Sequence, residues 1–107
     1  MKLELFTKGI DRSAHLSLAI ERRLRSALRR FRGRVAHVRV WLEDVNGPRG
    51  GDDLRCRMEA RLVPAFHVRA EETRSGAMRA VHLATQRLEN GVARQLGRVH
   101  ARRKGRF

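Results

Sequence analysis

The chain has 107 residues, of which 41% are hydrophobic and 34% charged, and its formal net charge is +14 at pH 7. This length suits one domain with a core of its own but not two, and the hydrophobic content excludes a wholly disordered basic tail. The positive charge indicates a polyanionic partner, either a nucleic acid or an anionic membrane.

The first half of the chain predicts a strand, a helix and a second strand. Residues 2–6 alternate apolar and polar side chains, which is typical of a half-buried strand. Between residues 13 and 31, apolar side chains recur every three or four positions and predict an amphipathic helix, with Asp11 or Ser13 as its N-cap. Residues 35–45 alternate again and predict a second strand.

Two more strands are predicted in the middle of the chain. Residues 46–53 are rich in turn formers and should form a mobile hairpin loop. The alternation then returns over residues 54–63 and, after a tight connection at Pro64 and Ala65, over residues 66–72. The side chains expected to face inward are Leu54, Cys56, Met58, Ala60, Leu62, Phe66, Val68 and Ala70.

A helical period returns near Ser75 and predicts a long second helix. Its apolar stripe continues through Gly91 to Val99, although a glycine costs a helix about 1 kcal/mol relative to alanine. Residues 101–107 are expected to be a flexible basic tail, and residues 1–100 to form a single domain.

The predicted order is therefore β-α-β-β-β-α, which is an α+β fold. The simplest way to cover every apolar face is a four-stranded sheet with both helices packed on one side. The second, third and fourth strands should form an antiparallel meander. The first strand is joined to the second through a helix, so these two should be parallel.

The charge is concentrated in the helical segments. Residues 1–34 hold ten Lys and Arg against three Asp and Glu, residues 35–74 hold seven against seven, and residues 75–107 hold eight against one. Two helices on one side of a sheet would therefore present one continuous basic surface, and most of its basic residues are arginine, which suits bidentate phosphate contacts. The candidate RNA-binding residues are Arg22, Arg23, Arg25, Arg29, Arg30, Arg79, Arg87, Arg94, Arg98, Arg102 and Arg103. The alternative is a solvated basic face without a partner.

The sequence favours recognition of the backbone of structured RNA over other uses of this charge. A sheet that stacks unpaired bases usually offers two or three exposed aromatic residues, and here only Trp41 and Phe6 are candidates. Membrane binding is disfavoured because the apolar stripes are rich in alanine and are needed for the core. No transmembrane stretch or signal peptide is recognisable, so we expect a cytoplasmic protein.

No constellation of catalytic or metal-binding residues emerges. The five histidines are scattered, and no glycine-rich phosphate loop precedes a helix. The single cysteine, Cys56, lies on the apolar side of a predicted strand and is expected to be a buried, inert thiol. We therefore expect a binding protein that is not an enzyme and uses no cofactor and no metal.

Three stretches carry a resemblance to a known family. IERRLRSALRRFRGRVAHVRVWLE (residues 20–43) is a charged helix that ends in an aromatic residue and leads into a V-x-V-x-L strand. RCRMEARLVPAFHVRAEET (55–73) has the pattern of two strands. AMRAVHLATQRLENGVARQLGRVHARRK (77–104) is a charged helix that ends in a basic cluster. In these features and in length, the chain resembles the short ribosome hibernation promoting factors, the family of the ribosome-associated inhibitor protein Y.

The resemblance implies a function in translation under stress. Members of this family bind the small subunit of the 70S ribosome near the decoding region, where their two basic helices face ribosomal RNA, and they stop translation. For this chain, the resemblance implies that the arginines named above contact ribosomal RNA. The short form lacks the dimerisation domain of longer members, so we expect a monomer when the protein is away from the ribosome.

Three alternatives remain open. A double-stranded-RNA-binding-domain-like module contains the same α-β-β-β-α core, but it normally opens its last helix with a lysine cluster, and here only Arg79 is present. A structural ribosomal protein would share the basic surface. An enzyme acting on RNA would need an acid/base pair on that surface, which the sequence does not offer.

Overall fold

The computed structural model describes residues 1–46, 50–51 and 53–104, with side chains described as far as Gly97. The predicted order of elements is confirmed. The elements are β1 (Lys2–Lys8), α1 (Ala14–Ala27), the 3-10 helix η1 (Arg29–Phe31), β2 (Val35–Asp44), β3 (Asp53–Leu62), β4 (His67–Ser75) and α2 (Ala77–Lys104).

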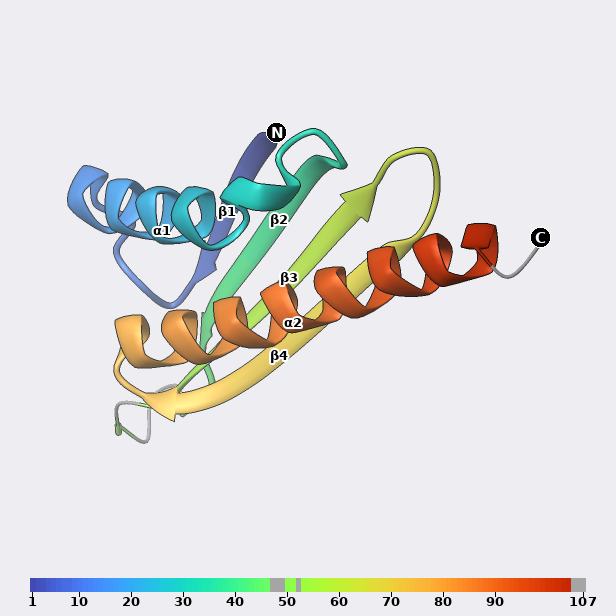
Figure 1. Ribbon diagram of the computed structural model, residues 1–107. Helices are drawn as coiled ribbons and strands as arrows, with labels where there is room; N and C mark the ends of the chain where they lie inside the picture. Colours follow the sequence, from blue (N-terminus) through green and yellow to red (C-terminus); the bar gives the residue numbers. More distant parts are fainter. Residues whose placement is uncertain (47–49, 52, 105–107) are drawn as a thin grey trace.

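The strands form one sheet in the order β1-β2-β3-β4. β1 pairs with β2 in parallel, whereas β2 with β3 and β3 with β4 pair antiparallel, as predicted. The parallel pair follows from the helical crossover between β1 and β2. Both helices cover the same side of the sheet, and its other side is left open (Figure 1).

The core lies between the sheet and the two helices. Every second residue of the inner strands points towards the helices and is buried, which is the consequence of the two-residue period of a strand. Burial of one leucine side chain is worth about 1.5–3 kcal/mol. The largest fully buried side chains are Leu24, Leu28, Leu42, Met58, Leu88, Val35, Val38, Val40, Val81, Val92, Thr85 and Cys56.

The first helix is shorter than predicted. Ser13 is its N-cap, because the Ser13 hydroxyl accepts a hydrogen bond from the backbone N–H of Leu16 at 3.0 Å. The α-helix ends at Ala27, and η1 follows instead of a continuous helix to Phe31. The backbone N–H of Phe31 donates to the Leu28 carbonyl at 2.9 Å, so the tighter 3-10 turn satisfies a carbonyl that the end of the helix leaves free.

The prediction that Phe66 faces inward is wrong. Phe66 lies just before β4, has a φ of 86° and is 44% exposed. Its carbonyl accepts a hydrogen bond from the N–H of Leu62 at 2.9 Å, which closes the turn between β3 and β4. The inward positions of β4 are Val68, Ala70 and the acidic Glu72. Residues 47–49 and 52 of the predicted hairpin loop between β2 and β3 lie outside the described residues.

The second helix runs unbroken through Gly91, as predicted, and extends to Lys104. A methyl group added at Gly91 would lie 2.6 Å from the Cγ1 atom of Val68. The glycine therefore allows α2 to approach β4 closely. Residues 101–104, which were expected to belong to a flexible tail, have a helical backbone and form the end of α2.

Candidate nucleic-acid interface

The outward faces of the two helices form one surface. The Arg23 Nε atom donates a hydrogen bond to Nδ1 of His82 at 2.9 Å, and the Arg30 guanidinium lies 3.8 Å from the Glu89 carboxylate. Arg23 lies on α1 and Arg30 lies seven residues later, on η1, while their partners His82 and Glu89 are also seven residues apart, on α2. The helices therefore run side by side in the same direction, as Figure 1 also shows.

Four of the predicted arginines are exposed on this surface, and their side chains form no ion pair or hydrogen bond with another described residue. A guanidinium has five N–H donors, and when no protein group accepts from them they remain solvated and available to an external anion. Two of these arginines belong to the α1 region and two to α2. They are Arg22, Arg29, Arg79 and Arg94.

Four other predicted arginines are held by neighbours. Arg23 and Arg30 join α1 to α2 as described above. The Arg25 Nε atom donates to the Glu21 carboxylate at 3.0 Å, one turn earlier on the same helix. Arg87 binds the Glu72 carboxylate. These contacts fix the directions of the side chains, and they also offset part of the positive charge.

Glu72 holds one of the predicted arginines in place, and the sequence did not lead us to select it. It is only 7% exposed and lies on the inward side of β4, where its carboxylate contacts Arg74 at 3.1 Å as well as Arg87. The signal was present in the sequence, because Glu72 continues the inward alternation of Val68 and Ala70. An acidic residue in such a position needs a cationic partner.

Two basic hollows lie at the end of α1, on either side of η1. One, of about 710 Å³, is lined by Ser26, Ala27, Arg29, Arg30, Arg32, Gly33 and Glu89. The other, of about 550 Å³, is lined by Met1, Arg25, Ser26, Leu28, Arg29 and Arg32. Arg29 and Arg32 border both hollows, although the sequence reasoning did not select Arg32. A phosphate placed in either hollow would meet several guanidinium groups, which bind phosphate with charge-assisted hydrogen bonds.

Three predicted residues cannot be placed on this surface. Arg98, Arg102 and Arg103 belong to the last turns of α2, and their side chains lie outside the described residues. The backbone at these three positions belongs to α2, which extends to Lys104.

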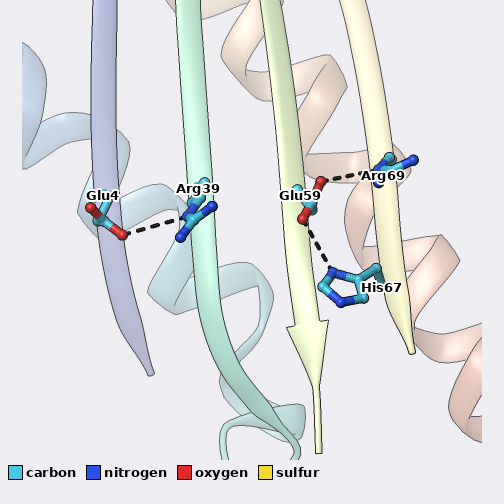
Figure 2. A network of polar contacts seen from close by, with 5 residues as sticks. All are labelled: Glu4, Arg39, Glu59, His67 and Arg69. Atoms are coloured by element: carbon cyan, nitrogen blue, oxygen red, sulfur yellow. Dashed lines mark hydrogen bonds and ion pairs between the residues drawn. The ribbon is translucent and has the colours of Figure 1, made fainter. Parts of the chain in front are cut away.

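The open side of the sheet has a different electrostatic character, because many of its charges are paired with one another. Figure 2 shows a row of such contacts across the strands. Arg39 lies 3.6 Å from Glu4, and Glu59 accepts a hydrogen bond from Arg69 at 3.0 Å and contacts His67 at 3.1 Å. The hydrogen bond from Arg69 lowers the pKa of Glu59 below its ordinary value.

No metal site or membrane span is found in the part of the chain that the structure describes. No group of three or more His, Cys, Asp or Glu side chains is placed to hold a metal ion there. None of the described helices combines the length and the hydropathy needed to cross a membrane. Cys56 is buried as predicted, and this burial raises the pKa of its thiol to about 12.

Comparison with known proteins gives a match in structure. No protein-family model matches the chain, and no curated protein matches it in sequence. Among solved structures, the chain is similar to the N-terminal domain of Thermus thermophilus protein Y, with 22% identity and a TM-score of 0.74. That match covers 88% of this chain and 98% of the other. It is also similar to a ribosomal subunit interface protein from Coxiella burnetii, with 16% identity and a TM-score of 0.75, where the match covers 91% and 99%.

At these identities the comparison shows a shared fold. It is the fold of a protein Y domain, so the resemblance noted in the sequence is matched in three dimensions.

Proposed function

We propose that the protein is a ribosome-associated hibernation factor, which binds ribosomal RNA of the small subunit near the decoding region and inhibits translation. The observation that carries this proposal is a set of exposed arginines on the outward faces of the two helices, the α1–α2 surface. Their side chains have no partner among the described residues, and they are Arg22, Arg29, Arg79 and Arg94. The fold supports it, because a protein Y domain and a ribosomal subunit interface protein share it.

The proposed mechanism is electrostatic and requires no chemical step. The exposed guanidiniums contact phosphates, and a domain held in this way occupies the path of messenger and transfer RNA. The arginines held by neighbours lose less side-chain freedom when RNA binds, which lowers the cost of association. If six to ten phosphates are engaged, affinity should fall by roughly 10³–10⁵ between 50 and 200 mM salt.

Arg29→Glu tests this surface most directly, because Arg29 is exposed and borders both basic hollows. We expect the affinity of the variant for the small subunit to fall at least about tenfold. The slope of the logarithm of affinity against the logarithm of salt concentration should fall in magnitude by about one. Binding is measured by sedimentation with purified subunits over a series of salt concentrations.

Arg61→Glu is the matched control, since it makes the same change of charge on the exposed, open side of the sheet. It should bind the subunit with nearly the affinity of the unchanged protein. Equal losses for the two variants would mean that net charge, and not the α1–α2 surface, determines binding.

A generic double-stranded-RNA-binding module is the second candidate, because the basic hollows suit phosphates of any duplex. That function predicts that a short RNA duplex competes with the ribosome for the protein at comparable concentrations.

A further inference from the structure

The open side of the sheet contains a hollow on the far side of the molecule from the helices. It has a volume of about 440 Å³, within the range of small-molecule sites. It is lined by residues of β2, β3 and β4, and besides Met58 and Ala70 these are Trp41, Arg57, Glu59, Arg69 and Glu71. This combination of one aromatic ring, two guanidiniums and two carboxylates differs from the uniformly basic α1–α2 surface.

Flat groups follow one another across the sheet towards this hollow. Phe6, Trp41, Arg57 and Glu71 are register partners on the four successive strands. The rings of Phe6 and Trp41 are stacked, with centroids 5.7 Å apart and planes inclined by 20°. The Arg57 guanidinium lies 5.6 Å from the centroid of the Trp41 ring. Because β2 lies between β1 and β3, Phe6 supports Trp41 from one side and the hollow opens on the other.

Such a floor suits a nucleobase. Unpaired RNA bases stack on aromatic rings and on arginine guanidinium planes, and this stacking is worth about 1–3 kcal/mol per base. The Arg57 guanidinium lies over the Trp41 ring but is exposed, so it can move aside to admit a base onto the ring and then cover that base.

The edges of the hollow carry complementary charges. The Glu71 side chain is 54% exposed, and its closest cation, Arg55, is 3.9 Å away, so its carboxylate oxygens are available to N–H donors. Guanine offers two adjacent donors, N1–H and N2–H, which match the two oxygens of a carboxylate. Adenine, cytosine and uracil instead present one donor beside an acceptor. The acceptor is repelled by the second carboxylate oxygen, so these bases make only one favourable contact. On the same strand, the Arg69 side chain is 78% exposed and uses its Nε atom to bind Glu59, which leaves its terminal N–H groups for a phosphate.

We propose that this hollow binds an unpaired guanine nucleotide of single-stranded RNA. The base stacks against Trp41 and Arg57, its N1–H and N2–H groups donate to Glu71, and its phosphate contacts Arg69. The site lies on the opposite side of the sheet from the proposed ribosomal surface and does not depend on it. A protein with both would hold a structured RNA on one side and a single strand on the other.

The chain contains a built-in reporter for this site. Trp41 is the only tryptophan and there are no tyrosines, so the intrinsic fluorescence reports on this hollow alone. The probes are three RNA pentamers, UUGUU, UUAUU and UUUUU, together with free guanosine monophosphate, titrated into the full chain at about 150 mM salt. We expect saturable quenching by UUGUU, with an affinity about tenfold or more above that for the other two pentamers.

Glu71→Gln should remove most of this preference for guanine, because the neutral amide accepts at only one of its two atoms. Glu4→Gln is the matched control, since Glu4 lies on the same side of the sheet outside the hollow and contacts Arg39, which does not contact Glu71. Circular dichroism confirms that both variants fold.

Equal quenching by all three pentamers, absence of quenching, or an unchanged preference in Glu71→Gln would overturn the proposal. Quenching by guanosine monophosphate as tight as by UUGUU would overturn the assignment to RNA, because a free nucleotide would then be the ligand. Arg29→Glu separates the two proposals: it should weaken ribosome binding and leave the fluorescence titration unchanged.

Discussion

Glu72 connects the interior of the sheet to the surface of α2. Its carboxylate is only 7% exposed, yet it binds Arg74 and Arg87, whose side chains are 43% and 66% exposed. A carboxylate in this position is stable only when it is paired, since an isolated buried charge is strongly disfavoured. Glu72 therefore orients Arg87 on the proposed RNA surface and ties α2 to β4.

Glu72→Gln tests this role at the scale of one residue. We expect the free energy of unfolding to fall by about 1–3 kcal/mol, because the amide loses two charge-assisted contacts in a nearly buried position. Urea denaturation at neutral pH measures the change. Glu89→Gln is the comparison, since its pair with Arg30 spans 3.8 Å, and its cost should stay within about 1 kcal/mol. Equal costs for the two variants would contradict an anchoring role for Glu72.

At the scale of elements, the packing of α2 on β4 depends on Gly91. Alanine at this position gains about 1 kcal/mol of helix propensity, but its methyl group would lie 2.6 Å from Val68 Cγ1. Overpacking of this kind costs about 1–3 kcal/mol, and a branched valine on a strand cannot easily turn away. The clash should therefore outweigh the gain in propensity.

We predict that Gly91→Ala lowers the free energy of unfolding, whereas Gly97→Ala raises it by up to about 1 kcal/mol. Gly97 is the matched control because a methyl group there meets no atom of the described residues within 4 Å. Combining Gly91→Ala with Val68→Ala should show favourable coupling in a double-mutant cycle, measured by denaturant unfolding. A stabilising effect of Gly91→Ala alone would show that α2 can move away from the sheet at no cost.

The elements themselves were predictable from the sequence, because each has a clear period. The alternation in β2 and β3 and the three- and four-residue spacing in both helices follow from burial on one side only. The structure differs from the prediction at two places where local hydrogen bonds determine the conformation of the backbone. Phe66 turns outward because its carbonyl closes the turn to β4, and the helix after Ser13 tightens at Leu28 to satisfy its last carbonyls. Neither contact leaves a signature in the spacing of apolar residues.

The candidate site was predictable in part. The concentration of arginine in two helical segments was sufficient to locate the surface, because the topology places both helices on one side of the sheet (Figure 1). Sequence could not separate the arginines that are held from those that are free, since contacts such as Arg23 with His82 join residues far apart in the chain. It also missed Arg32, which becomes part of the site only through the 3-10 turn.

At the scale of the whole molecule, the fold separates two electrostatic surfaces. The arginines of the α1–α2 surface repel one another, which lowers the stability of the fold. Bound phosphates would neutralise this charge and restore the stability. On the open side of the sheet, many of the charges are paired with one another, as the contacts in Figure 2 illustrate. The net charge of +14 is therefore expressed mainly on one side of the molecule, and this asymmetry orients the protein towards a polyanion.

Sedimentation of the purified protein with separated ribosomal subunits, at about 150 mM salt and with an RNA duplex as competitor, is the decisive test of ribosome binding through the α1–α2 surface. We expect saturation near one copy per small subunit, weak binding to the large subunit and little displacement by the duplex. Weak binding to both subunits that the duplex abolishes would contradict it, and would identify the α1–α2 surface as a general site for double-stranded RNA.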